Sequence, residues 1–387
     1  MLYQIPQKGG SFLKQRIFAV FLALLLIPVL SPQPLHAQAV SCSAEACVLI
    51  EATTGKILFE KNSATKRPMA STTKIMTTLL CLESGGLDDP FIVDSEAIHV
   101  EGSSMGLQEG DIVTKRALCY GMMLPSGNDA ANAVAVRLAS SQPAFAEQMN
   151  TRAAKIGMTN TCFVTPSGLE GEGHGASALD MALLTREALK NEDFRAICSQ
   201  PSAKVAFGDP PYERTLKNTN KLLTSCEGVI GVKTGFTDEA GRCLVSACTR
   251  NDVTLICVTL KAPDDWNDHR TLYDYGFSRV TRQEVALPQG MTLPVVGGTT
   301  EEITLRTDTI PVVGADSTEI DFTLLAPPFV YAPIRQGEAV AELQLSYHGR
   351  VVDILPLYAA EQVEAIQIQT EPSSLWERLR HFFANLF

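Results

Sequence analysis

A serine followed three positions later by a lysine can form a nucleophile together with its base. Ser71 and Lys74 have this spacing and stand at the start of an apolar stretch, residues 71–82, whose periodicity predicts a helix. Residues i and i+3 share one helix face, and the helix N-terminus stabilises negative charge developing on the serine. Because the serine is inert until deprotonated, the pKa of the lysine must be lowered by burial or by a nearby cation. The same spacing occurs without such a stretch at Ser11/Lys14 and Ser63/Lys66.

Two further motifs could complete this chemistry, and the first is S-G-N at residues 126–128. It is expected in a turn between two helices, and Asn128 or Asp129 would cap the second helix. The Ser126 hydroxyl can relay a proton toward a leaving amine. The Asn128 amide, which both donates and accepts, can hold a peptide backbone.

The other motif is K-T-G at residues 233–235, on an expected strand. Lys233 and Thr234 offer a cation and a hydroxyl to a terminal carboxylate, which predicts a preference for the end of a peptide chain. Lys233 is also the second cation that would lower the pKa of Lys74. Gly235 allows the strand to approach a neighbouring segment closely.

The order S-x-x-K, S-x-N, K-T-G is the signature of penicillin-recognising serine acyl-transfer enzymes. Over residues 44–280 the chain resembles the low-molecular-mass D-alanyl-D-alanine carboxypeptidases, the serine-type penicillin-binding proteins of the peptidase S11 family. The segments that carry this resemblance are Leu124–Ala130, Lys233–Thr237, Thr165–Leu169 with His174 following, and Asp274–Phe277.

The resemblance implies an activity, a fold and a set of ligands. The enzyme would remove the terminal D-alanine from peptidoglycan stem peptides through an acyl-enzyme on Ser71, and β-lactam antibiotics would be covalent inhibitors. It would need no metal and no organic cofactor. The fold class would be α/β (α+β), with a β-lactamase/transpeptidase-like antiparallel sheet and helices on both faces.

The resemblance also implies an oxyanion hole, and Arg270 is a further candidate site residue. The backbone N–H groups of Ser71 and Phe236 would form the oxyanion hole. Because the family often has His where this chain has Phe236, we expect an altered rate or pH profile; activity would persist, since the backbone makes the hydrogen bond. Arg270 would reinforce the carboxylate pocket, unless it is an ordinary surface arginine.

The elements that must position these residues follow from the apolar pattern. Strands are expected at 47–50, 57–59, 229–236, 243–249 and 253–260, and helices at 71–82, 115–124 and 129–138. Strands at both ends of a helix-rich segment predict one sheet closed by distant parts of the chain. Beyond residue 283, a small all-β module is expected from segments at 303–305, 320–325, 339–347 and 351–357.

The start of the chain has the features of a secretory signal peptide. Three cations and no acid precede the apolar run Ile17–Leu30, which is shorter than the roughly 20 residues that span a bilayer. The sequence Ala37-Gln38-Ala39 then offers a small-residue cleavage site. We therefore expect an exported protein at the outer face of a bacterial cell membrane, with the mature chain beginning near Val40.

The end of the chain predicts an amphipathic helix. At helical pitch one face carries the apolar residues Leu375, Trp376, Leu379, Phe382, Phe383, Leu386 and Phe387. A membrane interface would bury this face, and packing on its own domain is the alternative. The expected parts are the signal peptide at 1–39, a penicillin-binding serine carboxypeptidase domain at 40–283, an all-β C-terminal domain at 284–370 and the membrane-anchor helix at 371–387.

Composition limits the function classes. The net charge of −11, without a strongly basic region, argues against a nucleic-acid partner, and 45% hydrophobic residues argue against disorder. Ten cysteines in 387 residues are too few for a disulfide scaffold. Cys42 and Cys47 could pair, whereas several others lie in apolar segments and are expected to be buried.

Three other functions are alternatives to a serine carboxypeptidase. A class A β-lactamase shares the first and third motifs, but typically has Asp where this chain has Gly127, and its hydrolytic loop glutamate could only be Glu170 or Glu172. A zinc peptidase is disfavoured because the six histidines are scattered without paired ligand spacing. A catalytically silent peptidoglycan-binding scaffold would retain the fold, and covalent labelling by a β-lactam would distinguish it.

Overall fold

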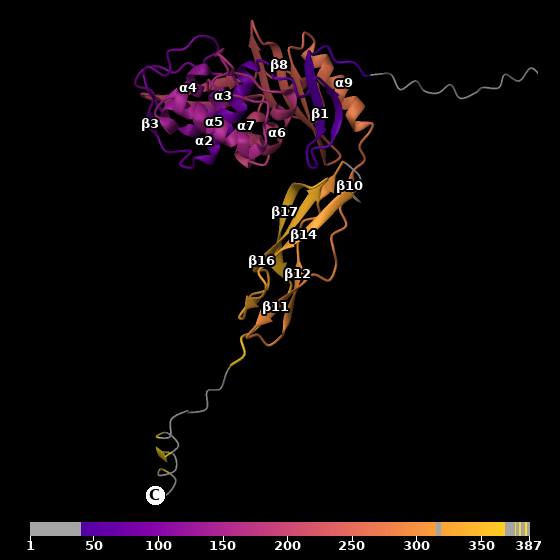
Figure 1. The fold of residues 1–387 in the computed structure, drawn as a ribbon. Coiled ribbons are helices and arrows are strands. Elements are labelled where there is room, and N and C mark those ends of the chain that lie inside the picture. Colours follow the sequence, from indigo (N-terminus) through magenta and orange to yellow (C-terminus); the bar gives the residue numbers. More distant parts are fainter. Residues whose placement is uncertain (1–39, 315–318, 368–375, 377–378, 381–383, 385–387) are drawn as a thin grey trace, which may run out of the picture. The chain divides into compact units, whose positions relative to one another are not determined.

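The computed structural model describes residues 40–314, 319–367, 376, 379–380 and 384. Its main sheet is antiparallel, with strand order β2-β1-β9-β8-β7 (Figure 1). The strands are β1 (Ala46–Glu51), β2 (Ile57–Lys61), β7 (Val229–Thr237), β8 (Gly241–Arg250) and β9 (Val253–Leu260). Since β1 pairs with β9, the expectation that distant parts of the chain close one sheet is confirmed.

Position in the sheet explains the composition of the strands. β1 is buried throughout and β9 nearly so, which is why both are almost continuously apolar. By contrast, β7 is an edge strand that pairs only with β8 and is buried only in part. The K-T-G motif therefore lies on an edge whose outer backbone groups can pair with a peptide.

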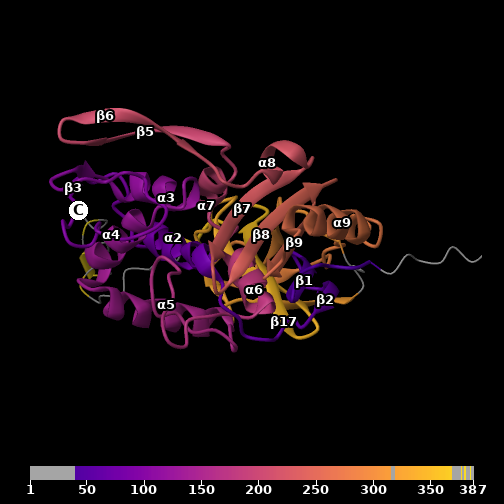
Figure 2. The same ribbon diagram turned by 90° about the horizontal axis from the view of Figure 1, so that it is seen from above.

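Helices lie on both faces of this sheet, as expected (Figures 1 and 2). They are η1 (Ala70–Thr73), α2 (Lys74–Glu83), α3 (Lys115–Met123), α4 (Asn128–Ala139), α5 (Gln142–Ile156), α6 (Ala178–Ala188), α7 (Glu192–Cys198), α8 (Leu222–Ser225) and α9 (Asp265–Phe277). One face is covered by α9, while α6 packs on the other, and η1 contacts β7 and β8. Two two-stranded antiparallel sheets complete this part: β3 (Phe91–Ile92) with β4 (Ile112–Val113), and the hairpin of β5 (Ser202–Gly208) with β6 (Pro211–Lys217).

The capping expected at the start of α4 is wrong. The N-cap residue is Gly127, and no side chain caps this helix. Asn128 instead directs its amide group to Lys74, and the Asp129 carboxylate accepts hydrogen bonds from backbone N–H groups of residues 105–107. Both side chains therefore join the helix to other segments around the S-G-N turn.

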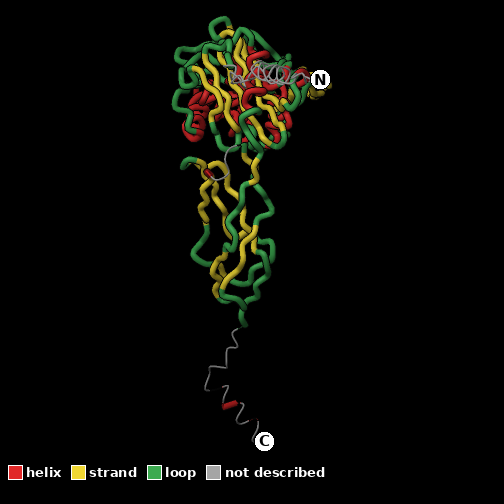
Figure 3. Tube along the Cα trace, turned by 90° about the vertical axis from the view of Figure 1, so that its right-hand side faces the viewer, coloured by secondary structure: helices red, strands yellow, loops and turns green. Residues whose placement is uncertain are grey.

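A separate all-β domain follows, as the sequence predicted (Figure 3). Its six-stranded sheet has the order β14 (Ile320–Leu325), β16 (Ala339–Tyr347), β17 (Arg350–Ala359), β12 (Glu302–Arg306), β11 (Thr292–Val296) and β15 (Val330–Tyr331). A short antiparallel pair is formed by β10 (Gln283–Glu284), which precedes these strands in the sequence, and β13 (Val312–Val313), which lies between β12 and β14. This domain has its own apolar core, which includes Ile303, Leu343 and Leu357.

The expected signal peptide and most of the expected C-terminal helix lie outside the described residues. Within the described part, no helix is both long and apolar enough to cross a membrane. All ten cysteines are free thiols, so Cys42 and Cys47 are not joined by a disulfide. The burial expected for cysteines in apolar segments is confirmed at Cys81, Cys119, Cys243, Cys248 and Cys257.

Candidate active site

The Ser71 hydroxyl and the Lys74 amine are in hydrogen-bond contact, with 2.8 Å between Oγ and Nζ. Ser71 belongs to the 3₁₀ turn η1, and Lys74 is the first residue of α2. Both are held where the chain enters the helix, so the expectation that i, i+3 spacing places them together is confirmed. The Lys74 side chain is fully buried.

Lys74 has two further partners that fix the direction of its amine. Nζ lies 2.6 Å from Asn128 Oδ1 and 2.7 Å from the Ser167 carbonyl oxygen. Both oxygens can only accept, so each takes one N–H of the amine. A neutral amine has two N–H bonds and one lone pair, and the remaining direction points to Ser71 Oγ. An ammonium would donate to all three oxygens; in the neutral amine the lone pair faces Ser71 Oγ, where it can accept the serine proton.

The surroundings of Lys74 favour this neutral form. Burial lowers its pKa well below the usual range, and the charge of Lys233 lowers it further. The carboxylate of Asp129 acts in the opposite direction with a smaller effect. The sequence expectation that burial and Lys233 would together lower the pKa agrees with this arrangement.

Lys233 is buried in β7, and burial lowers the pKa of its ammonium to about 7. Its Nζ donates to the Thr234 carbonyl oxygen at 2.8 Å. The hydroxyls of Thr234 and Thr219 lie 2.6 Å apart. Lys233 is thus joined to the backbone of Thr234, which itself lines the cleft described next.

A cleft of about 360 Å³ brings most of the predicted site residues together. Its lining includes Ser71, Ser126, Thr234, Gly235 and Phe236. Lys74, Asn128 and Lys233 are buried behind it and are connected to it through the contacts described above.

Gly235 and Phe236 have different relations to this cleft. A Cβ on Gly235 would lie 3.0 Å from the Ser71 backbone nitrogen, so only glycine lets β7 approach the nucleophile this closely. The Phe236 side chain is 64% exposed. Its ring lies at the surface, so any oxyanion contact would come from its backbone, as expected.

Ser126 has a left-handed backbone conformation, with φ of +69°. Such a conformation is uncommon for a residue other than glycine and is concentrated at functional sites. The side chain of Ser126 is nevertheless buried and lines the cleft.

The cleft contains an arginine that the sequence analysis missed. Arg242 lies on β8 directly opposite Phe236, and its Nε and Nη2 donate to Asp265 Oδ1 at 3.1 and 2.6 Å. Its guanidinium also lies 5.5 Å from the Trp266 ring centre. Asp265 is almost fully buried, so it holds the guanidinium in place at the wall of the cleft.

Arg270, the arginine that the sequence suggested, is placed differently. It lies on α9 and donates to Asn267 Oδ1 at 3.1 Å and to Ser225 Oγ at 2.8 Å. It is not among the residues that line the cleft with Ser71. The antiparallel pairing of β7 with β8 across the turn that joins them was the signal that could have identified Arg242, because it places this residue opposite Phe236.

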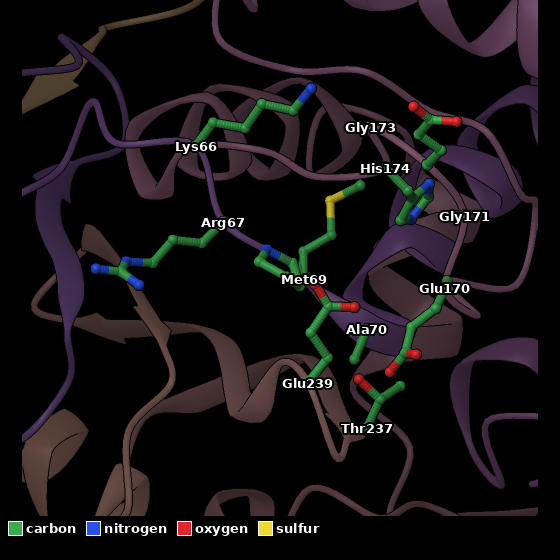
Figure 4. A pocket seen from close by; sticks show the side chains of 13 residues that line it. Lys66, Arg67, Met69, Ala70, Glu170, Gly171, Gly173, His174, Thr237 and Glu239 are labelled. Carbon is green, nitrogen blue, oxygen red and sulfur yellow. The ribbon is translucent and has the colours of Figure 1, made fainter.

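A second pocket, of about 650 Å³, borders η1 (Figure 4). Ala70, Glu170, Glu172 and His174 are among its lining residues. The two glutamates considered for a β-lactamase mechanism therefore line this pocket, outside the cleft that contains Ser71. In the described residues, no group of three His, Cys, Asp or Glu side chains is arranged to hold a metal ion.

Comparison with known proteins decides the family. Residues 33–264 match the peptidase S11 family, described as D-alanyl-D-alanine carboxypeptidase. The chain belongs to this family. As an S11 member it is a peptidase, and the predicted family is confirmed.

Two relatives of known name agree with this assignment. The chain is 32% identical over 344 residues to the D-alanyl-D-alanine carboxypeptidase DacF of Bacillus subtilis, covering 83% of this chain and 86% of that protein. It is 32% identical to DacC of Escherichia coli, covering 84% and 86%.

The structure of the Streptomyces K15 DD-transpeptidase matches 62% of this S11 chain and 98% of its own, with a TM-score of 0.59 and 33% identity. That of the carboxypeptidase DacD of Francisella tularensis matches 84% and 95%, with a TM-score of 0.60; at 24% identity it bears on the fold alone. The transpeptidase-like fold class is confirmed.

Proposed function

We propose that this S11 peptidase is a serine D-Ala-D-Ala carboxypeptidase that removes the terminal D-alanine from peptidoglycan stem peptides. The observation that carries the proposal is the contact between Ser71 Oγ and Lys74 Nζ; when the amine is neutral, donation to Asn128 and Ser167 leaves its lone pair facing the serine. Such a pair can generate an alkoxide-like nucleophile at neutral pH without a histidine.

The proposed reaction begins with acylation. Ser71 Oγ bonds to the carbonyl carbon of the penultimate D-alanine while its proton passes to Lys74 Nζ. The carbonyl electron pair moves onto oxygen, which the N–H groups of Ser71 and Phe236 stabilise. The C–N bond then breaks, and the proton passes from Lys74 through the Ser126 hydroxyl to the amine of the departing D-alanine. Water hydrolyses the resulting ester and restores Ser71.

The restriction to a chain end comes from groups that bind the terminal carboxylate. We assign this binding to Lys233, Thr234 and Arg242, with Asn128 and Gly235 placing the peptide backbone against β7. Arg242 is preferred to Arg270 because it lines the cleft and its geometry is fixed by Asp265. A planar guanidinium can bind a carboxylate through two parallel hydrogen bonds.

The location is proposed from the two ends of the sequence. The cationic and apolar pattern of residues 1–39 supports export, and the apolar face of residues 371–387 supports attachment to the outer surface of the cell membrane. Peptidoglycan stem peptides would be the substrate there, and β-lactams would acylate the same serine.

Intact mass of the mature protein with and without benzylpenicillin tests the proposal. We expect one adduct with the full mass of the antibiotic, because attack of the serine opens the β-lactam ring without releasing a fragment. Ser71→Ala should lack this adduct. A persistent adduct supports a carboxypeptidase, and rapid loss with release of the hydrolysed antibiotic would support a β-lactamase instead. Absence of both adduct and turnover would contradict the proposal and leave a binding scaffold.

The pH profile should report both lysines. For a substrate with a free carboxylate, kcat/KM should rise as Lys74 loses its proton and should fall as the pH passes through about 7, where Lys233 loses its own. The sign follows because only protonated Lys233 attracts the carboxylate. Lys233→Arg keeps the charge at all these pH values and should remove the alkaline fall while the acidic rise remains. An unchanged alkaline limb in this variant would show that another group titrates there.

A further inference from the structure

His174 links the loop at residues 164–174 to η1, the 3₁₀ turn that carries Ser71. Its Nε2 lies 2.9 Å from Thr73 Oγ1, and its Nδ1 lies 3.0 Å from the backbone nitrogen of Val164. Because a backbone N–H can only donate, Nδ1 is the acceptor, and Nε2 carries the ring proton and donates to Thr73. The Thr73 hydroxyl in turn donates to the Ala70 carbonyl oxygen at 2.8 Å.

The imidazole is neutral in this arrangement. Its ring is largely buried, which lowers its pKa to about 4, and the charge of Lys66 acts in the same direction. Other charged groups that line the pocket with it are Arg67, Glu170, Glu172 and Glu239. Both ring nitrogens therefore stay committed to their partners at neutral pH.

The loop that His174 holds reaches the catalytic lysine. The Ser167 carbonyl oxygen accepts from Lys74 Nζ at 2.7 Å, and the Pro166 carbonyl oxygen accepts from Thr77 Oγ1 at 2.6 Å. Gly168 lies so close to η1 that a Cβ would be 2.0 Å from the Ala70 carbonyl oxygen. The loop is thus packed on η1 and the first turn of α2, and His174 holds its start through the contact with the Val164 backbone N–H.

We propose that His174 is a positioning residue for acylation: it fixes the loop so that the Ser167 carbonyl aims the Lys74 lone pair at Ser71. This inference rests on the proposed function. The effect is geometric, since His174 touches neither the substrate nor the reacting atoms. A displacement of the acceptor by about 1 Å at such a site lowers the reaction rate by about 100-fold. Loss of the hydrogen bonds of His174 should therefore slow acylation by about 10-fold to 100-fold.

The geometry makes a graded test possible. His174→Ala removes both contacts, whereas His174→Asn keeps a side-chain oxygen that can accept from the Val164 N–H and loses the contact to Thr73. Because His174 lines an open pocket (Figure 4), the alanine variant leaves a space that free imidazole can enter from solvent. His99→Ala is the matched control, since His99 is exposed in the same domain and contacts Glu109.

The measurement is the second-order rate constant of acylation by benzylpenicillin across pH, normalised to the fraction of protein that is finally labelled. We expect His174→Ala to be about 10-fold to 100-fold slower with a shifted acidic limb, His174→Asn to be intermediate, and imidazole to restore part of the rate. His99→Ala should match the unmodified protein.

Two results would overturn the inference. One is a normal rate constant and pH profile in His174→Ala. The other is a slower rate with an unchanged pH profile and no recovery in imidazole, which would indicate a structural role only. Failure of the proposed function is distinguishable from both, because the unmodified protein itself would then form no adduct.

Discussion

Lys74→Met should lower the rate constant of acylation by benzylpenicillin about 1,000-fold while the protein stays folded. A positioned general base contributes about 100-fold to 10,000-fold, and here the same amine also orients the serine hydroxyl. The middle of that range corresponds to about 4 kcal/mol in the activation free energy. The thermal midpoint should fall but folding should persist: Met has a similar length and replaces an amine that burial already shifts toward its neutral form, but the Asn128 and Ser167 oxygens lose the donor they share. The rate constant of adduct formation and the thermal midpoint are the two measurements.

The chain contains a matched control for this experiment. Lys66 stands three residues after Ser63 in the same S-x-x-K spacing, but it is exposed, and Ser63 donates instead to Glu60. Lys66→Met should therefore acylate at the normal rate. Lys74→Arg separates charge from basicity: it keeps a cation that cannot give up its proton at neutral pH, so it should be as slow as Lys74→Met. A fast Lys74→Arg variant would refute the assignment of Lys74 as the base.

The part of the site that the sequence could predict is the part determined by local spacing. Ser71 and Lys74 are three residues apart at a helix start, so their contact follows from helical geometry alone. Lys233, Thr234 and Gly235 follow one another on a strand, which fixes their relation to each other. The sheet was also predictable from local sequence, because its buried strands are almost continuously apolar.

The contacts of Lys74 beyond Ser71 could not be predicted, because they depend on tertiary packing. The Ser167 carbonyl is a backbone group, and no residue type marks it in the sequence. Asn128 illustrates a second limit: its position suited a helix cap, and the sequence could not show that Lys74 would lie near enough to take its amide oxygen. Arg242 is an intermediate case, since correct pairing across the turn after β7 would have placed it opposite Phe236.

Arg242→Ala should lower kcat/KM for a peptide ending in D-Ala-D-Ala by about 100-fold, or about 2.7 kcal/mol. The guanidinium would lose a charge-assisted contact with the terminal carboxylate, and the buried Asp265 would lose the cation that it now holds. Arg242→Lys should recover only part of the loss, because an ammonium cannot bind a carboxylate through two parallel hydrogen bonds. Steady-state kinetics of D-alanine release provide the measurement.

A substrate with a C-terminal amide tests whether the carboxylate is the group that Arg242 recognises. The unmodified enzyme should process the amide poorly, and Arg242→Ala should cause little further loss with it, since the missing charge and the missing guanidinium belong to one interaction. Arg270→Ala tests the alternative candidate from the sequence. It should change kcat/KM for the carboxylate substrate by about twofold at most, because the contacts of Arg270 with Asn267 and Ser225 are at the surface. If Arg270→Ala lost about 100-fold and Arg242→Ala did not, the carboxylate would bind beside α9, and the Arg242–Asp265 pair would serve only to join β8 to that helix.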